Sequence, residues 1–226
     1  MKKLALMAVA MAFVLVSTGG WSQAACKKVT VSAPSKSELT LRMDMRKLWE
    51  DHIAWTKAYI VSAVNDLPGT DKVAARLLKN QQDIGDAIKP FYGEEAGDKL
   101  TSLLKDHILI AADLVGAAKA GDNAKAAEAE KKWYDNGDQI AEFLGKANPN
   151  WTKESLKEML DTHLSLTKAI AVAAITKDLD AEIKAADSNH EHMLMMADAL
   201  TDGIVKQFPK KFGESCAKMS SKKCCS

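Results

Sequence analysis

Apolar residues recur at intervals of three and four along most of the chain, in stretches separated by short polar segments. There are six such stretches, over residues 38–66, 71–89, 95–119, 123–146, 152–177 and 179–208. The strict alternation typical of strands is absent, and the helix-favouring residues alanine, leucine, lysine and glutamate dominate. All five prolines fall between the stretches and none inside one, namely Pro34, Pro68, Pro90, Pro149 and Pro209. The pattern predicts an all-α protein of about six helices.

A short string recurs in alternate stretches and predicts how the helices pair. It reads LWEDHIAWTKA from residue 48, LLKDHILIAAD from residue 103 and MLDTHLSLTKA from residue 159. Its fifth residue is a histidine each time, so that His52, His107 and His163 lie 55 and 56 residues apart. A shift of 55 residues places Gln81 on Asn136 in the second helices, whereas the third hairpin needs a few inserted residues. We predict three degenerate helical hairpins that close into one bundle over residues 38–209; an open solenoid is less expected with so few units.

The two ends of the chain lie outside the predicted bundle. A basic start, an apolar stretch over residues 4–16 and the small residues around Ala24 predict a signal peptide over residues 1–24. An N-terminal segment over 25–37 and a flexible basic tail over 210–226 complete the chain. No other stretch is long and apolar enough to span a bilayer. We therefore expect export to the periplasm or the cell exterior.

The four cysteines also lie outside the predicted bundle, at Cys26, Cys216, Cys224 and Cys225. Export permits a disulfide, and a Cys26–Cys216 pair would join the two ends. A lipid anchor on Cys26 is disfavoured, because Gln23 stands where the processing motif needs an apolar residue. Soft-metal capture by the tail lacks CxxC spacing. The favoured interpretation is a tail with incidental thiols.

Composition and motifs exclude several function classes. The formal net charge is +1, so no overall field attracts nucleic acid or an anionic membrane. The chain contains no CxxCH, HExxH, glycine-rich phosphate loop or GxSxG motif, and it lacks the paired ExxH motifs of di-iron bundles. Whether the protein is an enzyme stays open, since no candidate base or substrate pocket is evident. The sequence names no protein partner.

The three repeated histidines are predicted to face the bundle interior. The residues three and four positions before each one, and three and seven after it, are apolar or aromatic and continue one helix face. The neighbouring acids Glu50, Asp51, Asp106 and Asp161 are rotated by about 100° or 200° and are expected to face solvent. Because unpaired buried imidazoles are costly, the three rings need partners.

A bound transition metal would satisfy all three rings at once, and copper or zinc suits imidazole ligands. The predicted ligands are His52, His107 and His163, with His190 as a possible fourth from the His- and Met-rich string NHEHMLMM. Gln81 and Asn136 are candidates for hydrogen bonds that orient the ligands. The leading hypothesis is an exported helical bundle that binds copper or zinc.

Two alternatives remain open at this point. In a metal-free structural or protein-interaction module, the histidines would bond neighbouring groups such as the hydroxyls of Thr56 and Thr167. In a small-molecule binder, the histidines would line a pocket with the aromatic side chains of Trp49, Trp55 and Tyr59.

Several strings resemble those of a family of bacterial all-helical proteins. They are LWEDHIAWTK, LLKDHILIAA, MLDTHLSLTKA, NGDQIAEFLGKANPNW and MADALTDGIVKQFP. The resemblance extends from about residue 41 to residue 209. It implies the all-helical fold and these boundaries, and it carries no activity, cofactor or site residue.

Overall fold

A computed structural model describes residues 33–213, and six long helices account for most of this range. They are α1 (Lys36–Val64), α2 (Thr70–Tyr92), α3 (Glu94–Lys119), α4 (Asn123–Ala147), α5 (Lys153–Thr176) and α6 (Leu179–Gln207), followed by the short 3-10 helix η1 (Pro209–Lys211). No strand occurs in the described range, which confirms the all-α prediction. The predicted signal peptide and the four cysteines lie outside the described residues.

Side-chain caps define where several helices begin. Ser35, Asp122, Thr152 and Asp178 each accept a hydrogen bond from the backbone N–H three residues further on. Such a cap pairs one of the four N–H groups that a helix start leaves without a partner. The polar segments between the apolar stretches therefore mark helix boundaries to within a few residues.

The prediction that no proline lies inside a helix is wrong for Pro90. α2 continues through Pro90 to Tyr92 and ends at Gly93, whose φ of 87° is one that glycine adopts readily. Aromatic packing holds this last turn in place: the Phe91 ring stacks on Phe212 with centroids 5.8 Å apart. Tertiary contacts thus override the local tendency of proline to end a helix.

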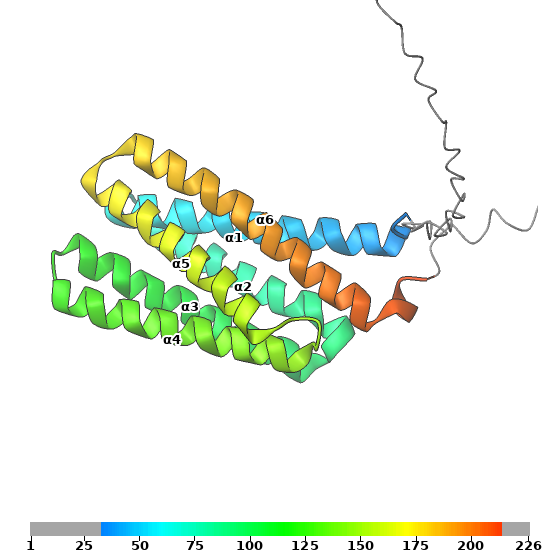
Figure 1. The fold of residues 1–226 in the computed structure, drawn as a ribbon. Coiled ribbons are helices and arrows are strands. Elements are labelled where there is room, and N and C mark those ends of the chain that lie inside the picture. The colour runs from blue at the N-terminus through cyan, green and yellow to red at the C-terminus, as the bar shows by residue number, and fades with distance from the viewer. Residues whose placement is uncertain (1–32, 214–226) are drawn as a thin grey trace, which may run out of the picture. The chain divides into compact units, whose positions relative to one another are not determined.

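The helices form a closed ring in which each packs against its neighbours in sequence and α6 packs against α1 (Figure 1). In addition, α1, α3 and α5 contact one another across the interior. The helices that carry the repeated histidines are therefore the three that meet at the bundle axis.

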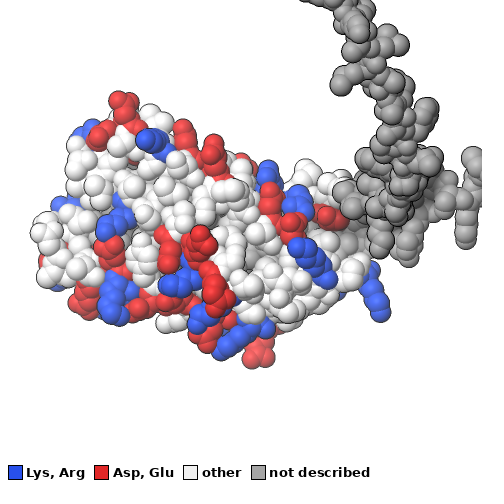
Figure 2. All heavy atoms as spheres, in the orientation of Figure 1, with Lys and Arg blue, Asp and Glu red and all other residues white. Residues whose placement is uncertain are grey.

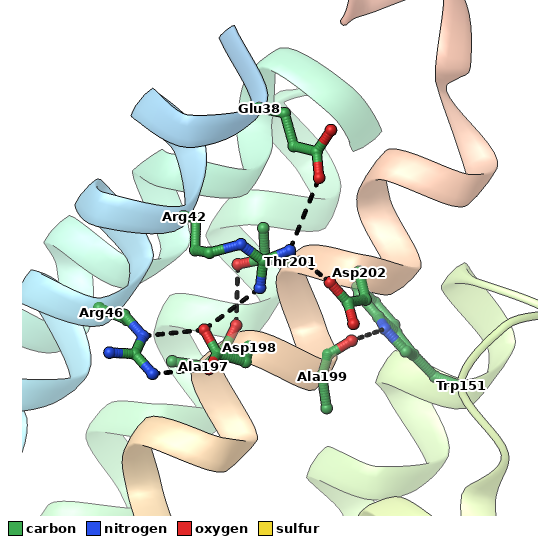
Figure 3. A network of polar contacts seen from close by, with 9 residues as sticks. All are labelled: Glu38, Arg42, Arg46, Trp151, Ala197, Asp198, Ala199, Thr201 and Asp202. Atoms are coloured by element: carbon green, nitrogen blue, oxygen red, sulfur yellow. Dashed lines mark hydrogen bonds and ion pairs between the residues drawn. The ribbon is translucent and has the colours of Figure 1, made fainter. Parts of the chain in front are cut away.

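Charged side chains join the first helix to the last (Figure 3). Arg46 makes two hydrogen bonds to the Asp198 carboxylate, of 2.9 and 2.7 Å. Arg42 bonds Asp202 at 2.5 Å and Asp198 at 3.3 Å, and Glu38 lies 3.7 Å from Arg42. Partly exposed pairs of this kind contribute up to about 1 kcal/mol each. This network of ion pairs between α1 and α6 therefore adds little to stability, but it fixes which faces of the two helices meet.

The outer surface carries acidic and basic side chains side by side, and Figure 2 shows them interspersed over the visible face. Many are pairs one helical turn apart, such as Lys47 with Asp51 at 2.6 Å. Among the described helices, none combines the length and the apolar character needed to cross a membrane.

Candidate functional site

The three repeated histidines meet at the bundle axis, each contributed by a different odd-numbered helix. His52, His107 and His163 are 2%, 3% and 3% exposed. The Nε2 atoms of His52 and His163 lie 3.5 Å apart, and their ring centroids are separated by 5.4 Å. His107 stacks beside His163 with a centroid separation of 6.2 Å. The convergence expected from the sequence spacing is therefore present.

Each ring is held through its Nδ1 atom by an amide from the second helix of the same hairpin. Asn136 Oδ1 lies 2.8 Å from His107 Nδ1, and Asn189 Oδ1 lies 3.0 Å from His163 Nδ1. Gln81 Nε2 lies 3.3 Å from His52 Nδ1. Such bonds fix ring orientation, as predicted for Gln81 and Asn136. Asn189 was missed by the sequence reasoning.

A second set of polar contacts repeats at an interval of 56 residues. Asn80, Asn136 and His192 each donate a hydrogen bond to the carbonyl four residues before the histidine of their own hairpin. The acceptors are the carbonyls of Leu48, Leu103 and Met159, at 3.0, 3.2 and 2.7 Å.

The predicted alignment of Gln81 with Asn136 fits these contacts, because each lies 29 residues after the histidine that it holds. Asn136 makes both the bond to the histidine and the bond to the carbonyl. In the first hairpin the adjacent amides Gln81 and Asn80 divide these two bonds, and in the third Asn189 and His192 divide them.

The proton positions on the rings follow from their partners. A tryptophan indole can only donate, so the 3.0 Å bond from Trp133 Nε1 requires an unprotonated Nε2 on His107. Neutral His107 then carries its hydrogen on Nδ1 and donates it to Asn136. Both nitrogens of this ring are thereby occupied by protein groups.

The other two rings form one chain of hydrogen bonds. Asn189 uses its Nδ2 to donate to Thr167 Oγ1 at 3.0 Å, so its Oδ1 accepts from His163 Nδ1–H. The free lone pair on His163 Nε2 then accepts from His52 Nε2–H, and His52 Nδ1 accepts from Gln81. All three imidazoles are neutral in this arrangement.

The surroundings keep the imidazoles neutral well below physiological pH. Burial, with a smaller effect of the neighbouring His163, lowers the pKa of His107 from 6.5 to about 3. Burial also lowers the pKa of His163 to about 4, against the opposing effect of the Asn189 hydrogen bond. The pKa of His52 is well below 6.5, first because of burial and then because of the other two rings. A neutral imidazole is the form that binds metal ions.

Gln81 is the least satisfied member of the cluster. Its Nε2 faces three acceptors, namely His52 Nδ1, Leu77 O at 2.9 Å and Asn80 Oδ1 at 3.1 Å, but an amide nitrogen carries only two hydrogens. Its Oε1 is buried without a hydrogen-bond partner among the described residues. The bond to His52 is consequently the weakest of the three ring contacts.

Two apolar cavities flank the histidine layer along the axis. The first, of about 30 Å³, is lined by the three histidines together with Trp49, Met45 and Met196, among others from all six helices. The second is of similar volume and lies on the far side, where Thr56 and Thr167 contribute to its wall. A volume of this size holds a single ion or one or two waters, and it is far below that of a pocket for a drug-sized ligand.

Other residues singled out in the sequence lie elsewhere. His190 is on the outer surface, with its Nε2 3.3 Å from Glu50 Oε1 and its side chain 46% exposed, so it does not join the trio. The buried face of α6 runs through Asn189, Met193 and Met196, and His190 is rotated away from it. His192 is partly buried and bonds a backbone carbonyl.

The aromatic and hydroxyl candidates are divided between different places. Trp49 lines the cavity beside the histidines, whereas Tyr59 lines the second cavity and Trp55 packs under Arg76. Thr167 bonds Asn189 and not His163, and Thr56 Oγ1 has no hydrogen-bond partner in the described part of the chain.

A conventional metal centre is not evident in the described residues. Over residues 33–213, no group of three or more His, Cys, Asp or Glu side chains is arranged to hold an ion. His52 and His163 nevertheless face each other through Nε2, with the rings held from behind. Two nitrogens sharing one tetrahedral ion at about 2.0–2.1 Å lie roughly 3.4 Å apart, close to the spacing here.

Comparisons with protein-family models, curated proteins and solved structures found no match to this chain. The partners that sequence reasoning missed, Trp133 and Asn189, each lie 26 residues from the histidine that they contact. Their constant offset is the one signal in the sequence that could have found them.

Proposed function

We propose that the protein binds a soft monovalent metal ion, Cu(I), between the Nε2 atoms of His52 and His163. The observation that carries the proposal is the 3.5 Å separation of these two atoms, in rings that are buried, neutral and anchored through Nδ1. Binding requires that His52 move its proton from Nε2 to Nδ1, where Gln81 Nε2 now donates, so the Gln81 amide must turn as well. The unpartnered Gln81 Oε1 can accept that proton's hydrogen bond after rotation of the amide.

The chemistry of the cavity favours copper over zinc. No carboxylate lines it, so a divalent ion would bring a buried charge of +2 without an opposite charge, which is costly. The remaining wall is apolar and includes the thioethers of Met45 and Met196. Thioether and imidazole ligands suit Cu(I).

His107 has a supporting role in this proposal. Its Nε2 lone pair is taken by the Trp133 indole, which would have to be displaced before His107 could bind an ion. We therefore reduce the three predicted ligands to two, with His107 stacked beside His163 as part of the wall.

A metal-free structural role is the competing candidate, and one observation favours it. The chain of bonds from Gln81 through His52 and His163 to Asn189 leaves no ring nitrogen without a partner in the absence of an ion. Under this alternative, the histidines specify how the three hairpins meet, as buried polar groups do in some bundles.

Metal content after loading tests the proposal. Because the four cysteines also bind soft ions, the full chain with Cys26, Cys216, Cys224 and Cys225 changed to serine is the parent. We expect it to retain about one Cu(I) per chain after anaerobic loading and desalting, and to retain no zinc under the same protocol.

Single variants assign the ligands. His52→Ala and His163→Ala should lose the copper while remaining helical by circular dichroism. His190→Ala is the matched control, since this histidine lies on the surface, and it should keep the full content. A folded parent that retains no copper would reject the proposal and leave the metal-free role.

A further inference from the structure

A surface cleft adjoins the histidine cavity. It has a volume of about 270 Å³ and lies between α5, α6 and the connection from α4 to α5. Its wall includes Met159 of α5, Gly203 of α6 and Trp151 of the connection. The cleft is open to solvent, whereas the histidine cavity is buried.

The cleft and the histidine cavity share part of their walls. Trp151, Leu156 and Leu200 line both. These three side chains therefore form the partition between solvent and the buried site. Leu156 and Leu200 are anchored on long helices, whereas Trp151 belongs to the short connection at residues 148–152.

Trp151 is the member of the partition that can move. Its indole is 7% exposed and makes one hydrogen bond, from Nε1 to the Ala199 carbonyl at 3.3 Å (Figure 3). It sits directly on Gly203, where an added Cβ would be 1.9 Å from Trp151 Nε1. The adjoining cleft is large enough to receive the indole if this side chain swings outward. The absence of a side chain at residue 203 is what allows the closed position.

We propose that this cleft is the port to the histidine cavity, with Trp151 as its gate and Met159 as the first soft ligand that an incoming ion meets. The inference rests on the proposed binding of a monovalent ion by His52 and His163. Met159 lines the outer cleft and Met196 the inner cavity, so that thioether groups lie on both sides of the partition. Outward rotation of the indole breaks its bond to Ala199, ends its contact with the Tyr92 ring and joins the two spaces.

Access is measured first without any metal. In the full chain lacking cysteines, Met196→Cys places one thiol on the wall of the inner cavity, and its reaction rate with methyl methanethiosulfonate reports access. Gly203→Ala and, separately, Trp151→Ala should each raise this rate by about tenfold or more, because they displace or remove the gate. Gly116→Ala is the matched control, since a Cβ there meets nothing within 4 Å.

The second measurement uses silver(I), an air-stable probe for Cu(I), without the Met196→Cys change. Stopped-flow tryptophan fluorescence should show faster association in the same two gate variants, with an unchanged stoichiometry of about one ion. Met159→Ala should slow association without changing the stoichiometry. Where Gly203→Ala does not fold, Trp151→Ala carries the test.

The outcomes separate the gate from the binding site. Equal labelling and association rates in the folded gate variants and the Gly116→Ala control would overturn the port. If the gate variants are labelled faster but the parent binds no silver, the port stands and the proposed ion site is rejected. Slow labelling in every variant together with stoichiometric silver would show another route to the site.

Discussion

The partners of the three imidazoles determine where each ring proton lies. His107 donates to Asn136 and accepts from Trp133, whereas His163 and His52 share a bond through Nε2. The different roles proposed for His107 and for the His52–His163 pair follow from this arrangement. Both nitrogens of His107 are engaged by protein groups, whereas an ion could replace the long bond between His52 and His163 once His52 moves its proton to Nδ1.

The neutral state of these rings predicts a loss of stability in acid. In the unfolded chain each histidine binds a proton below about pH 6.5, whereas in the folded chain the pKa values of His163 and His107 are about 4 and 3. The unfolded state therefore gains protons first as the pH falls. Between pH 6.5 and 5 the free energy of unfolding should drop by up to about 1.4 kcal/mol per pH unit for each buried histidine.

Urea unfolding of chelator-treated protein at a series of pH values measures this slope. His107→Gln should reduce it, since one buried neutral ring is gone. A parent protein whose free energy of unfolding does not change over this pH range would contradict the assignment of the three buried histidines as neutral.

Helical periodicity was sufficient to predict that His52, His107 and His163 face inward, since each is flanked by apolar residues on the same face. It could not predict which polar groups they bond. Trp133 is apolar in such a pattern, and its N–H acquires a partner only when α3 and α4 pack together. His190 was wrongly predicted to face inward. The buried face of α6 continues through Asn189, a polar residue that a search for apolar periodicity passes over.

Close helix contacts depend on particular small residues. At the crossing of α2 and α3, a Cβ on Gly85 would lie 2.6 Å from the Gly97 carbonyl and 2.0 Å from Thr101 Oγ1. The backbone carbonyl cannot move without shifting the whole helix. The two glycines therefore set how closely these neighbouring hairpins approach.

Gly85→Ala should consequently destabilise the protein by about 1–3 kcal/mol, despite the higher helix propensity of alanine. Gly116→Ala should instead stabilise it by about 0.5–1 kcal/mol, because its Cβ enters open space. Thermal and urea unfolding of both variants tests the crossing. Equal effects of the two changes would show that α2 and α3 are not in close contact at Gly85.

Asn80, Asn136 and His192, which are spaced 56 residues apart, each donate a hydrogen bond to the same carbonyl position of their own hairpin. His192→Asn should therefore keep the bond to the Met159 carbonyl and leave stability within about 0.5 kcal/mol of the parent. His192→Ala should cost about 1 kcal/mol, because that hydrogen bond is lost. If asparagine were as damaging as alanine, the equivalence of the third hairpin would be wrong.

Helix positions and pairing were readable from the sequence because prolines, caps and the repeated string mark them. Two details were not. The extension of α2 through Pro90 depends on the packing of Phe91 against Phe208 and Phe212, which lie more than 100 residues away. The division of roles between the adjacent amides depends on packing, which lets Asn80 reach the Leu48 carbonyl and Gln81 reach His52.

The ring closure brings all elements of the site together. α1 packs on both α2 and α6. Arg42 and Arg46 of α1 bind Asp202 and Asp198 of α6, which joins the first and the last long helix. Only in the closed ring do the odd-numbered helices share an interior, so the His52–His163 pair exists only in the complete bundle. Ion binding should accordingly stabilise the whole ring by mass action.

The most direct test of the ion site is a silver(I) titration of the cysteine-free chain labelled with ¹⁵N-histidine, followed by NMR of the ring nitrogens. Before silver, His52 should carry its proton on Nε2, and His107 and His163 on Nδ1. With one equivalent, the Nε2 signals of His52 and His163 should shift and couple to silver, while those of His107 keep their hydrogen-bonded values. Unchanged signals for His52 and His163 would contradict the site, and the cluster would then be a structural core of the bundle.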